Sequence, residues 1–379
     1  MAQMGAEVIR VDQIGGGPDY NRWPKTKEGV SLYWENLNRA KKSVALNLNA
    51  PEGRELLQEL VCKTGQFITN FPVDGFLAHN ALSARRADLI SVRIMGMADG
   101  SPALDYTVNA AVGYPGLTGD GPGPVNHVLP AWDLLTGAYA AFAMMAALHH
   151  RTATGGGQEV RIPLSDVAIG TASNLGSLAE VLYTGADRER LGNSVYGAFG
   201  RDFVTRDGIR LMVMAITPRQ WAGLIKVLNI TDEIAAIETE RGVHFNRDEG
   251  VRFQHRDVLY PLVESSIKQW NYAELRVAFD KVGACYGSYQ TMYQAAHDPV
   301  LVGNNPIFGK ASNPSGFDYP AAGAIATVPQ IERGAPVSAP LLGANSEEIL
   351  ADRLGLTVAM IGALYAKGII GIPPKGNDK

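Results

Sequence analysis

The stretch SVALNLNAPEGRELLQELVCKTGQFITN, residues 43–70, decides the fold class because it passes from strand to helix to strand. Apolar residues alternate over Ser43–Leu48, which predicts a buried strand. Asn49 is a candidate N-cap, Pro51 suits a first helical turn, and the leucines that follow recur at helical spacing. Gln66–Asn70 then predicts a second strand. A strand, a helix and a strand in this order indicate a crossover between parallel strands.

The same alternation extends on both sides of this stretch. Ala6–Val11 and Asp88–Ile94 are expected strands, and Ala78–Arg86 is an expected short helix. Strands separated by helices predict a doubly wound, Rossmann-like α/β domain with a mostly parallel sheet. The apolar run Leu134–Leu148 predicts a helix that is buried on every side, and Glu159–Ile162 should follow it as a strand.

The middle of the sequence predicts a smaller α+β domain. Asp202–Thr205 and Ile209–Ala215 flank a turn, as the two strands of a β-hairpin do. Amphipathic helices are expected near Pro218–Leu228, Arg256–Trp270 and Tyr272–Val282, and terminal helices at Ser346–Leu354 and Val358–Lys367. We therefore expect a large α/β domain over residues 1–190, a small α+β domain over 191–300, and a return of 301–379 to the large domain.

Composition and charge exclude several classes of protein. Of the 379 residues, 46% are hydrophobic and 19% are charged, which excludes a disordered or fibrous chain. The 34 basic and 38 acidic residues form no long runs of one sign. The sequence therefore shows no cluster of basic residues of the kind that binds nucleic acid or an anionic membrane. With two cysteines, no cluster of metal ligands, no signal peptide and no long uncharged apolar run, the sequence predicts a cytoplasmic enzyme without a metal.

Asp133 stands out because it joins the loop 114–130, rich in glycine and proline, to the apolar helix. One interpretation is an N-cap that accepts hydrogen bonds from the first free amides of the helix. The other is a covalent nucleophile, because a carboxylate near a helix N-terminus stays ionised and nearby amides can stabilise an oxyanion. The pattern alone leaves both interpretations open.

Five blocks of sequence resemble the class III CoA-transferase family, of the formyl-CoA transferase and carnitine CoA-transferase type, in the family's order. They are MGAEVIRVD at Met4–Asp12, NLNRAKKSVALNLNAPEGRELL at Asn36–Leu57, FITNFPVDGFL at Phe67–Leu77, HVLPAWDLLTGAYAAFAMMAALHHR at His127–Arg151 and APLLGANSEEILADRLGL at Ala339–Leu356. The resemblance spans nearly the whole chain and places Asp133 at the family's nucleophilic aspartate. It implies an interlocked homodimer, with CoA entering as part of the substrate and not as a permanently bound cofactor.

Further segments resemble the subgroup of this family that moves CoA between the C1 and C4 carboxylates of mesaconate. They are IGGGPDYNRWP at Ile14–Pro24, DYTVN at Asp105–Asn109, VNHVLPAWD at Val125–Asp133 and YGAFGRDF at Tyr196–Phe203. The resemblance implies transfer within one molecule through a covalent aspartyl intermediate. Two alternatives stay open: transfer of CoA to a separate carboxylic acid, and a catalytically inactive or truncated accessory subunit.

Two departures from the family bear on the CoA site. Family members have a strand and a helix before the block at Met4–Asp12, and this sequence begins inside that helix, so we expect the first strand of the large domain to be missing. Family members of the formyl-CoA transferase type also carry basic residues toward the CoA phosphates, where this sequence has Gln13, Asn49 and Ala78. Arg39, Lys41 and Lys42 are the expected replacements. The resemblance maps the backbone of the CoA pocket to Leu46, Asn47, Leu48, Asn70, Phe71, Pro72, Ala103, Leu104, Asp105 and Tyr106.

A dicarboxylate substrate needs a cationic anchor, and the guanidinium fork suits a carboxylate. Arg22 and Arg201 are the candidates for this role. The alternative interpretation of each is a salt bridge to a neighbour such as Asp19 or Asp202. The related α-methylacyl-CoA racemases carry a histidine base where this sequence has Leu104, and an apolar side chain cannot abstract an α-proton, so racemisation is disfavoured.

Overall fold

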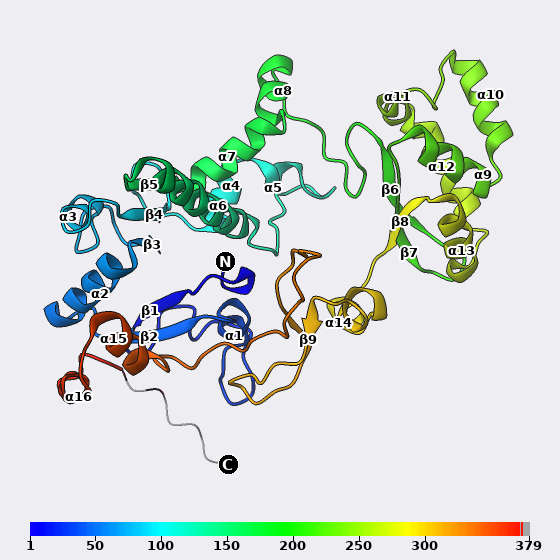
Figure 1. Cartoon of the computed structure of the whole chain (residues 1–379). Helices are drawn as coiled ribbons and strands as arrows, with labels where there is room; N and C mark the ends of the chain where they lie inside the picture. Colours follow the sequence, from blue (N-terminus) through cyan, green and yellow to red (C-terminus); the bar gives the residue numbers. More distant parts are fainter. Residues whose placement is uncertain (372, 374–379) are drawn as a thin grey trace. The chain divides into compact units, whose positions relative to one another are not determined.

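The computed structural model describes residues 1–371 and 373, and these fold into two compact units (Figure 1). Unit 1 contains residues 1–108 and 129–175 and the described residues from 297 onward, and unit 2 contains 109–128 and 176–296. Unit 2 thus takes in nearly all of the expected small domain and also residues 109–128 and 176–190 of the expected large one. Residues 372 and 374–379 of the expected C-terminal return lie outside the described part of the chain.

The elements of unit 1 come from three separate segments of the chain. The first segment supplies a short 3-10 helix at Ala2–Met4, β1 (Ile9–Gln13), α1 (Leu32–Leu37), β2 (Lys42–Leu46), α2 (Pro51–Thr64), β3 (Gln66–Thr69), α3 (His79–Ser83), β4 (Ile90–Met95) and the start of α4 (Asp105–Ala111). The second supplies α6 (Ala131–Thr154), β5 (Gln158–Pro163) and α7 (Leu164–Asn174). The third supplies a π-helical turn at Pro299–Gly303, β9 (Phe308–Gly309), β10 (Ala321–Ala322), α15 (Ser346–Leu354) and α16 (Val358–Ala366).

The strands of the predicted α/β unit are parallel, as expected, but they form two sheets. β1 pairs with β2, with Val11 opposite Val44. β3, β4 and β5 form the second sheet in that order, with Val92 opposite both Ile68 and Val160. The mixed α/β class is therefore confirmed, whereas the single continuous sheet is wrong for the described residues.

Segments from the first and last thirds of the chain pack together on the β1–β2 sheet. Val44 and Leu46 of β2 pack in one apolar cluster with Leu57 and Leu60 of α2 and with residues of α15 and α16. Leu46 also forms a backbone bridge with Ile370 near the C-terminus. Helix α2 begins at Pro51, and its N-cap is Ala50, which has no capping side chain; the prediction of Asn49 as the N-cap is therefore wrong.

Helix α6 is longer than predicted and is buried on one face only. Its buried residues recur at helical spacing, from Trp132 to Ala147, and pack against β4, β5 and α7 (Figure 1). Phe142 and Met145 lie on the opposite side and are 71% and 58% exposed, so the prediction of a helix buried all round is wrong. By length and composition alone α6 could cross a membrane, but its packing makes it a core helix of the α/β unit.

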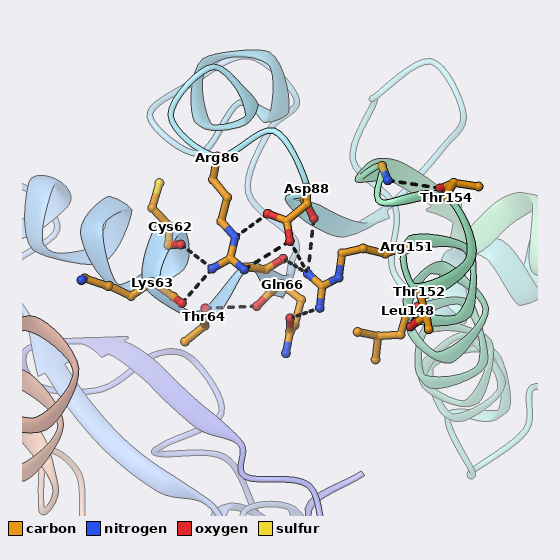
Figure 2. A network of polar contacts seen from close by, with 12 residues as sticks. Cys62, Lys63, Thr64, Gln66, Arg86, Asp88, Leu148, Arg151, Thr152 and Thr154 are labelled. Atoms are coloured by element: carbon orange, nitrogen blue, oxygen red, sulfur yellow. Dashed lines mark hydrogen bonds and ion pairs between the residues drawn. The ribbon is translucent and has the colours of Figure 1, made fainter.

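A polar network of two arginines lies at the C-terminal end of α6, and one of them, Arg151, attaches the helix to the residues before β3 and β4 (Figure 2). Arg151, in the last turn of α6, donates hydrogen bonds to the carbonyls of Gly65 and Asp88 and to the side chain of Gln66, at 2.9, 3.3 and 2.9 Å. Arg86 binds the Asp88 carboxylate at 2.7 Å and two carbonyls at the end of α2 at 2.8 Å. Because Gly65 and Asp88 precede β3 and β4, this network holds the end of α6 at the amino edge of the strands.

The orientation of α6 follows from this attachment. The turn Gly155–Gly157 returns the chain from α6 directly into β5, so the helix runs antiparallel to the strands. Gly157 is required there, because a Cβ atom would lie 2.1 Å from the Leu89 carbonyl oxygen. The N-terminus of α6 therefore lies toward the carboxyl ends of the strands, where ligands bind in α/β proteins.

Unit 2 contains the predicted hairpin and helices. Its elements are α5 (Tyr114–Leu117), α8 (Ser177–Thr184), β6 (Phe199–Val204), β7 (Arg210–Ala215), α9 (Pro218–Val227), α10 (Thr231–Arg241), α11 (Glu249–Gln254), α12 (Arg256–Ile267), α13 (Tyr272–Val282), β8 (Cys285–Ser288) and α14 (Met292–Ala296). β6 and β7 are antiparallel, and β8 adds to β7. Phe199, Trp221, Leu259 and Phe279 join this sheet and its helices in one apolar core.

Candidate active site

Asp133 is the third residue of α6 and does not cap that helix. The N-cap position is Pro130, which provides no side-chain acceptor. The acceptor comes instead from Asp105, whose Oδ2 receives hydrogen bonds from the backbone N–H groups of Trp132 at 2.7 Å and Asp133 at 3.1 Å. The N-cap interpretation of Asp133 is therefore wrong, and its side chain lies at the surface of the chain.

The surroundings of Asp133 raise the pKa of its carboxyl group. Partial burial is the largest cause, because it removes hydration from the charged form, and the nearby Asp105 carboxylate adds like-charge repulsion. The positive charge of Arg22 acts in the opposite direction. A more basic carboxylate is a stronger nucleophile, so this environment favours the covalent role over a purely structural one.

The first amides of α6 are not available as an oxyanion hole in this arrangement. The expectation from the sequence was that N–H groups near Asp133 could stabilise an oxyanion. Those of Trp132 and Asp133 are hydrogen-bonded to Asp105, and that of Leu134 donates to the Pro130 carbonyl at 3.1 Å. Other donors must therefore stabilise negative charge that develops on a substrate oxygen.

Arg22 lies close enough to Asp133 for its charge to act on the carboxylate. Its Nη1 donates a hydrogen bond to the Tyr33 hydroxyl at 3.3 Å, and its guanidinium lies over the Tyr33 ring, 5.2 Å from the centroid. The alternative ion pair with Asp19 is not formed, since Asp19 pairs with Arg10 at 2.8 Å. The guanidinium of Arg22 therefore has capacity for a substrate carboxylate near the candidate nucleophile.

Arg201 belongs to β6 in unit 2, and its side chain has protein partners there. Its Nη2 lies 3.3 Å from Glu264 Oε2, and its guanidinium lies about as far from the Phe203 ring as from the Tyr260 ring, 5.1 and 5.3 Å from the centroids. The expected alternative, a salt bridge to a neighbour, is present, but the partner of Arg201 is Glu264. Asp202 pairs with Arg210 instead. A substrate carboxylate at Arg201 would have to compete with Glu264.

The expected CoA-binding segments are held by specific side chains of unit 1. Leu46 is buried in β2, the Asn47 N–H donates to the Ile369 carbonyl at 2.8 Å, and the Leu48 N–H donates to Gln13 Oε1 at 2.8 Å. In the third segment, Leu104 is 70% exposed and Asp105 is buried. Gln13 thus orders the backbone of the first segment that is expected to bind CoA.

Arg93 holds the loop that contains Asn70, Phe71 and Pro72. It is fully buried in β4 and donates to the carbonyl oxygens of Phe71, Pro72 and Leu77 at 2.6, 2.8 and 2.9 Å. Its remaining charge is balanced by Glu159 on β5, with Nε and Oε1 3.1 Å apart. No local pattern signals this role, because the loop and Arg93 are about twenty residues apart.

The expected phosphate-binding cations are all engaged with protein groups. Arg39 is buried and binds Asn36, Asn313 and Tyr319, at 3.0, 3.1 and 3.2 Å. Lys42 pairs with Glu348 at 2.6 Å, which raises its pKa. Lys41 donates to Asn38 at 3.1 Å, and burial lowers its pKa, helped by the charge of Arg10.

Arg54 on α2 is a cation that sequence reasoning missed. Its Nε donates to the Leu48 carbonyl at 2.7 Å, and its guanidinium lies 5.4 Å from the centroid of the Phe76 ring. It is exposed, and within the described part of the chain its terminal nitrogens have no carboxylate partner. Arg54 therefore presents charge beside Leu48, in the first of the expected CoA-binding segments. Among the described residues, no group of three or more His, Cys, Asp or Glu side chains could hold a metal ion.

The structure is thus a mixed α/β chain with a surface aspartate near the carboxyl ends of parallel strands, the edge of the sheet where ligands bind in α/β proteins. The sequence profile of CoA-transferase family III matches residues 1–346, so the chain belongs to this family.

Known relatives agree with this assignment. The 2-methylfumaryl-CoA isomerase of Chloroflexus aurantiacus is 42% identical over 383 residues, which cover 99% of this chain and 93% of the relative. The succinyl-CoA–D-citramalate CoA-transferase of the same organism is 26% identical over 98% of this chain and 92% of its own length. The crystal structure of a CAIB/BAIF family protein from Brucella suis matches with a TM-score of 0.73 at 23% identity over 92% of both chains, which supports the fold.

Substituting Asp133 should separate its chemical role from its contribution to stability. Asp133→Asn should abolish turnover while leaving the Tm at pH 7 equal to that of the wild type or higher. The pKa of Asp133 is raised in the folded state, so its ionisation at neutral pH opposes folding. Any gain in Tm should shrink as the pH falls through about 4, where both states become protonated.

The matched control for this substitution is Asp232→Asn, which removes an exposed carboxylate from the first turn of α10. It should leave activity unchanged and lower the Tm slightly, because a helix dipole contact is lost. Turnover by Asp133→Asn would contradict the nucleophile assignment.

Proposed function

We propose that this enzyme interconverts 2-methylfumaryl-CoA and 3-methylfumaryl-CoA by moving CoA between the C1 and C4 carboxylates of mesaconate. The observation that carries this proposal is the 42% identity, over 99% of the chain, to an isomerase of that name. Asp133, with its raised pKa and with Arg22 beside it, supports the same chemistry. The reaction needs no electron transfer and no resident cofactor, because CoA arrives on the substrate.

The proposed reaction has two anhydride stages. Asp133 attacks the thioester carbonyl, the C–S bond breaks, and CoA leaves as a thiolate, which gives a mixed anhydride of Asp133 and mesaconate. The thiolate then attacks the Asp133 carbonyl carbon, so that mesaconate leaves and Asp133 becomes a CoA thioester. The second carboxylate of mesaconate attacks this thioester and expels the thiolate. Attack of the thiolate on the new acyl carbonyl restores Asp133 and releases the isomer.

Retention of mesaconate distinguishes an isomerase from an ordinary CoA transferase. A dicarboxylate held beside Asp133 reacts at an effective concentration far above that of free acid in solution. Water must be kept out, since both covalent intermediates would hydrolyse. We propose that Arg22 anchors a carboxylate of mesaconate, that CoA lies along the segments 46–48, 70–72 and 103–106, and that Arg54 contacts its phosphates. Arg201, in unit 2, is a separate candidate for the second carboxylate.

The decisive experiment uses mesaconyl-CoA with labelled free mesaconate or succinate added during turnover. The regioisomer should appear by chromatography, and no label should enter the CoA thioesters. Incorporation of label would instead support intermolecular transfer of CoA. That is the activity named for the succinyl-CoA–D-citramalate CoA-transferase of Chloroflexus aurantiacus, which is 26% identical to this chain. Absence of both isomerisation and exchange would refute the proposal in favour of an inactive or accessory subunit.

Replacing each candidate anchor by methionine tests how the dicarboxylate is held. Loss of a charge-assisted contact of about 1.5–3 kcal/mol should lower kcat/KM for isomerisation about 10- to 100-fold in Arg22→Met and Arg201→Met. Arg353→Met, which removes an exposed ion pair with Glu7, is the matched control and should have wild-type kinetics. Wild-type kinetics in Arg22→Met or Arg201→Met would remove that residue from the proposed site.

We further propose a cytoplasmic homodimer, with the interlocked arrangement of the family. Support comes from the exposed apolar face of α6, where Tyr139 and Phe142 line a groove of about 570 Å³ against β5 and α7. An exposed apolar patch of this kind favours a protein interface. Light scattering should give twice the chain mass of 40.6 kDa, and Phe142→Glu should shift the protein toward monomer. A monomeric wild type would contradict the proposal, and a stable Phe142→Glu dimer would place the interface elsewhere.

A further inference from the structure

We propose that Asp105 is a positioning residue for the nucleophile: it occupies the amides at the start of α6 and so keeps the Asp133 side chain from folding back onto its own helix. The amides are those of Trp132 and of Asp133 itself, and one oxygen, Oδ2 of Asp105, accepts from both. The catalytic consequences rest on the proposed function, whereas the structural part of the inference does not.

Asp105 is a buried residue that holds the first turn of α6 through two hydrogen bonds, and its contact with the helix is not a surface contact. Its side chain is only 2% exposed, and it comes from the segment after β4, 28 residues before Asp133. The hydrogen bond from Trp132 is short, at 2.7 Å, and that from Asp133 is of ordinary length, at 3.1 Å. The acceptor of both is a buried carboxylate, and hydrogen bonds to a carboxylate are stronger than those between neutral groups. The start of α6 is therefore fixed by a different part of unit 1.

The need for such a support follows from the position of Asp133. An aspartate in the first helical turn is attracted to the free N–H groups there, both by hydrogen bonding and by the helix dipole. A carboxylate that accepted those hydrogen bonds would be less basic and would point along the helix. Because Asp105 already accepts from these donors, the Asp133 carboxylate does not compete for them and can reach a substrate.

The same arrangement adjusts the charge around the nucleophile. Two charged groups act on the Asp133 carboxylate: Asp105 at the start of α4, and Arg22 in the segment between β1 and α1. Asp105 raises the pKa of Asp133 and Arg22 lowers it. Asp105 thus gives the nucleophile greater basicity as well as its orientation.

The ordinary alternative is that Asp105 is only a helix cap, and unit 2 offers a matched control. Asp207 likewise lies far in sequence from the helix it caps, and both its oxygens accept from the N–H of Tyr272, the first residue of α13, at 3.0 and 3.2 Å. Asp105→Asn and Asp207→Asn each replace a capping carboxylate by a neutral acceptor of the same shape. Only the first should change the chemistry of Asp133.

The first measurement does not depend on activity. The Asp133 carboxyl group is titrated by NMR in protein carrying carbon-13 aspartate, with Asp133→Asn to assign its signal. In Asp105→Asn the midpoint should move to lower pH, because a neighbouring negative charge is gone, while Asp207→Asn should titrate as the wild type does. An unchanged midpoint in Asp105→Asn would overturn the electrostatic part of the inference.

The second measurement uses isomerisation. Asp105→Asn should move the acidic limb of the pH profile of kcat/KM to lower pH, with KM little changed. Asp105→Ala, which frees both amides to compete for Asp133, should lower kcat about 100-fold. Equal losses of Tm in Asp105→Asn and Asp207→Asn, with kinetics unchanged in both, would show that Asp105 is a cap and nothing more.

The role of Asp105 can still be tested if the Asp105→Asn variant does not fold or if the wild type has no isomerase activity. If Asp105→Asn does not fold, amide hydrogen exchange in the wild type decides, since the Trp132 and Asp133 amides should both be protected, and rapid exchange of both would refute the support. If the wild type does not isomerise mesaconyl-CoA, the proposed function fails, while the NMR titration still tests the role of Asp105.

Discussion

Helix α6 is fixed at both ends by hydrogen bonds to other parts of unit 1, and the geometry of the candidate site depends on this constraint. Arg151 binds the amino edge of β3 and β4 from the last turn, and Asp105 binds the first turn from the segment that follows β4. A helix of 24 residues is about 36 Å long, so a small tilt at one end would displace the other by several ångströms. Attachment at both ends prevents that displacement and sets the position of Asp133 beyond the carboxyl ends of the strands.

Charge at this site is arranged for reactivity at the expense of stability. Partial burial and Asp105 both make ionised Asp133 less favourable than an exposed aspartate. A carboxylate that forms and breaks an anhydride must be basic enough to attack a thioester and must still be released when the thiolate returns. Arg22 offsets part of the repulsion and can also bind a substrate carboxylate, so one guanidinium would serve both the nucleophile and the dicarboxylate.

Local sequence patterns predicted most helices and strands correctly. The roles of Asp105 and Arg93 and the pairing of the strands depend on contacts between residues far apart in the sequence, so local patterns could not predict them. The hairpin around 206–208 and the helix Tyr272–Val282 follow from turn residues and apolar spacing, and both were confirmed. The role of Asp105 depends on a contact across 28 residues, so the resemblance to the family placed Asp105 only in the backbone of an expected CoA pocket. The local pattern likewise left the N-cap interpretation of Asp133 open. Arg93 is similar: an arginine in an apolar strand signals nothing until its three carbonyl partners are known. The split sheet is also a matter of pairing, which periodicity within a strand does not encode.

The loop that contains Phe71 and Pro72, which is expected to contact CoA, is ordered by the buried side chain of Arg93. Burial of an arginine is costly, and here the cost is met by Glu159 and by carbonyl oxygens that would otherwise face solvent or a bound anion. Because a peptide unit is planar and trans, turning the Pro72 carbonyl toward Arg93 directs the Val73 N–H away from it. Gln13, at the end of β1, also orders the backbone, because its side-chain oxygen accepts a hydrogen bond from the Leu48 N–H group. A neutral side chain and one buried cation thus fix the backbone of these segments, so in the proposed CoA complex Arg54 would need to supply only charge for a phosphate.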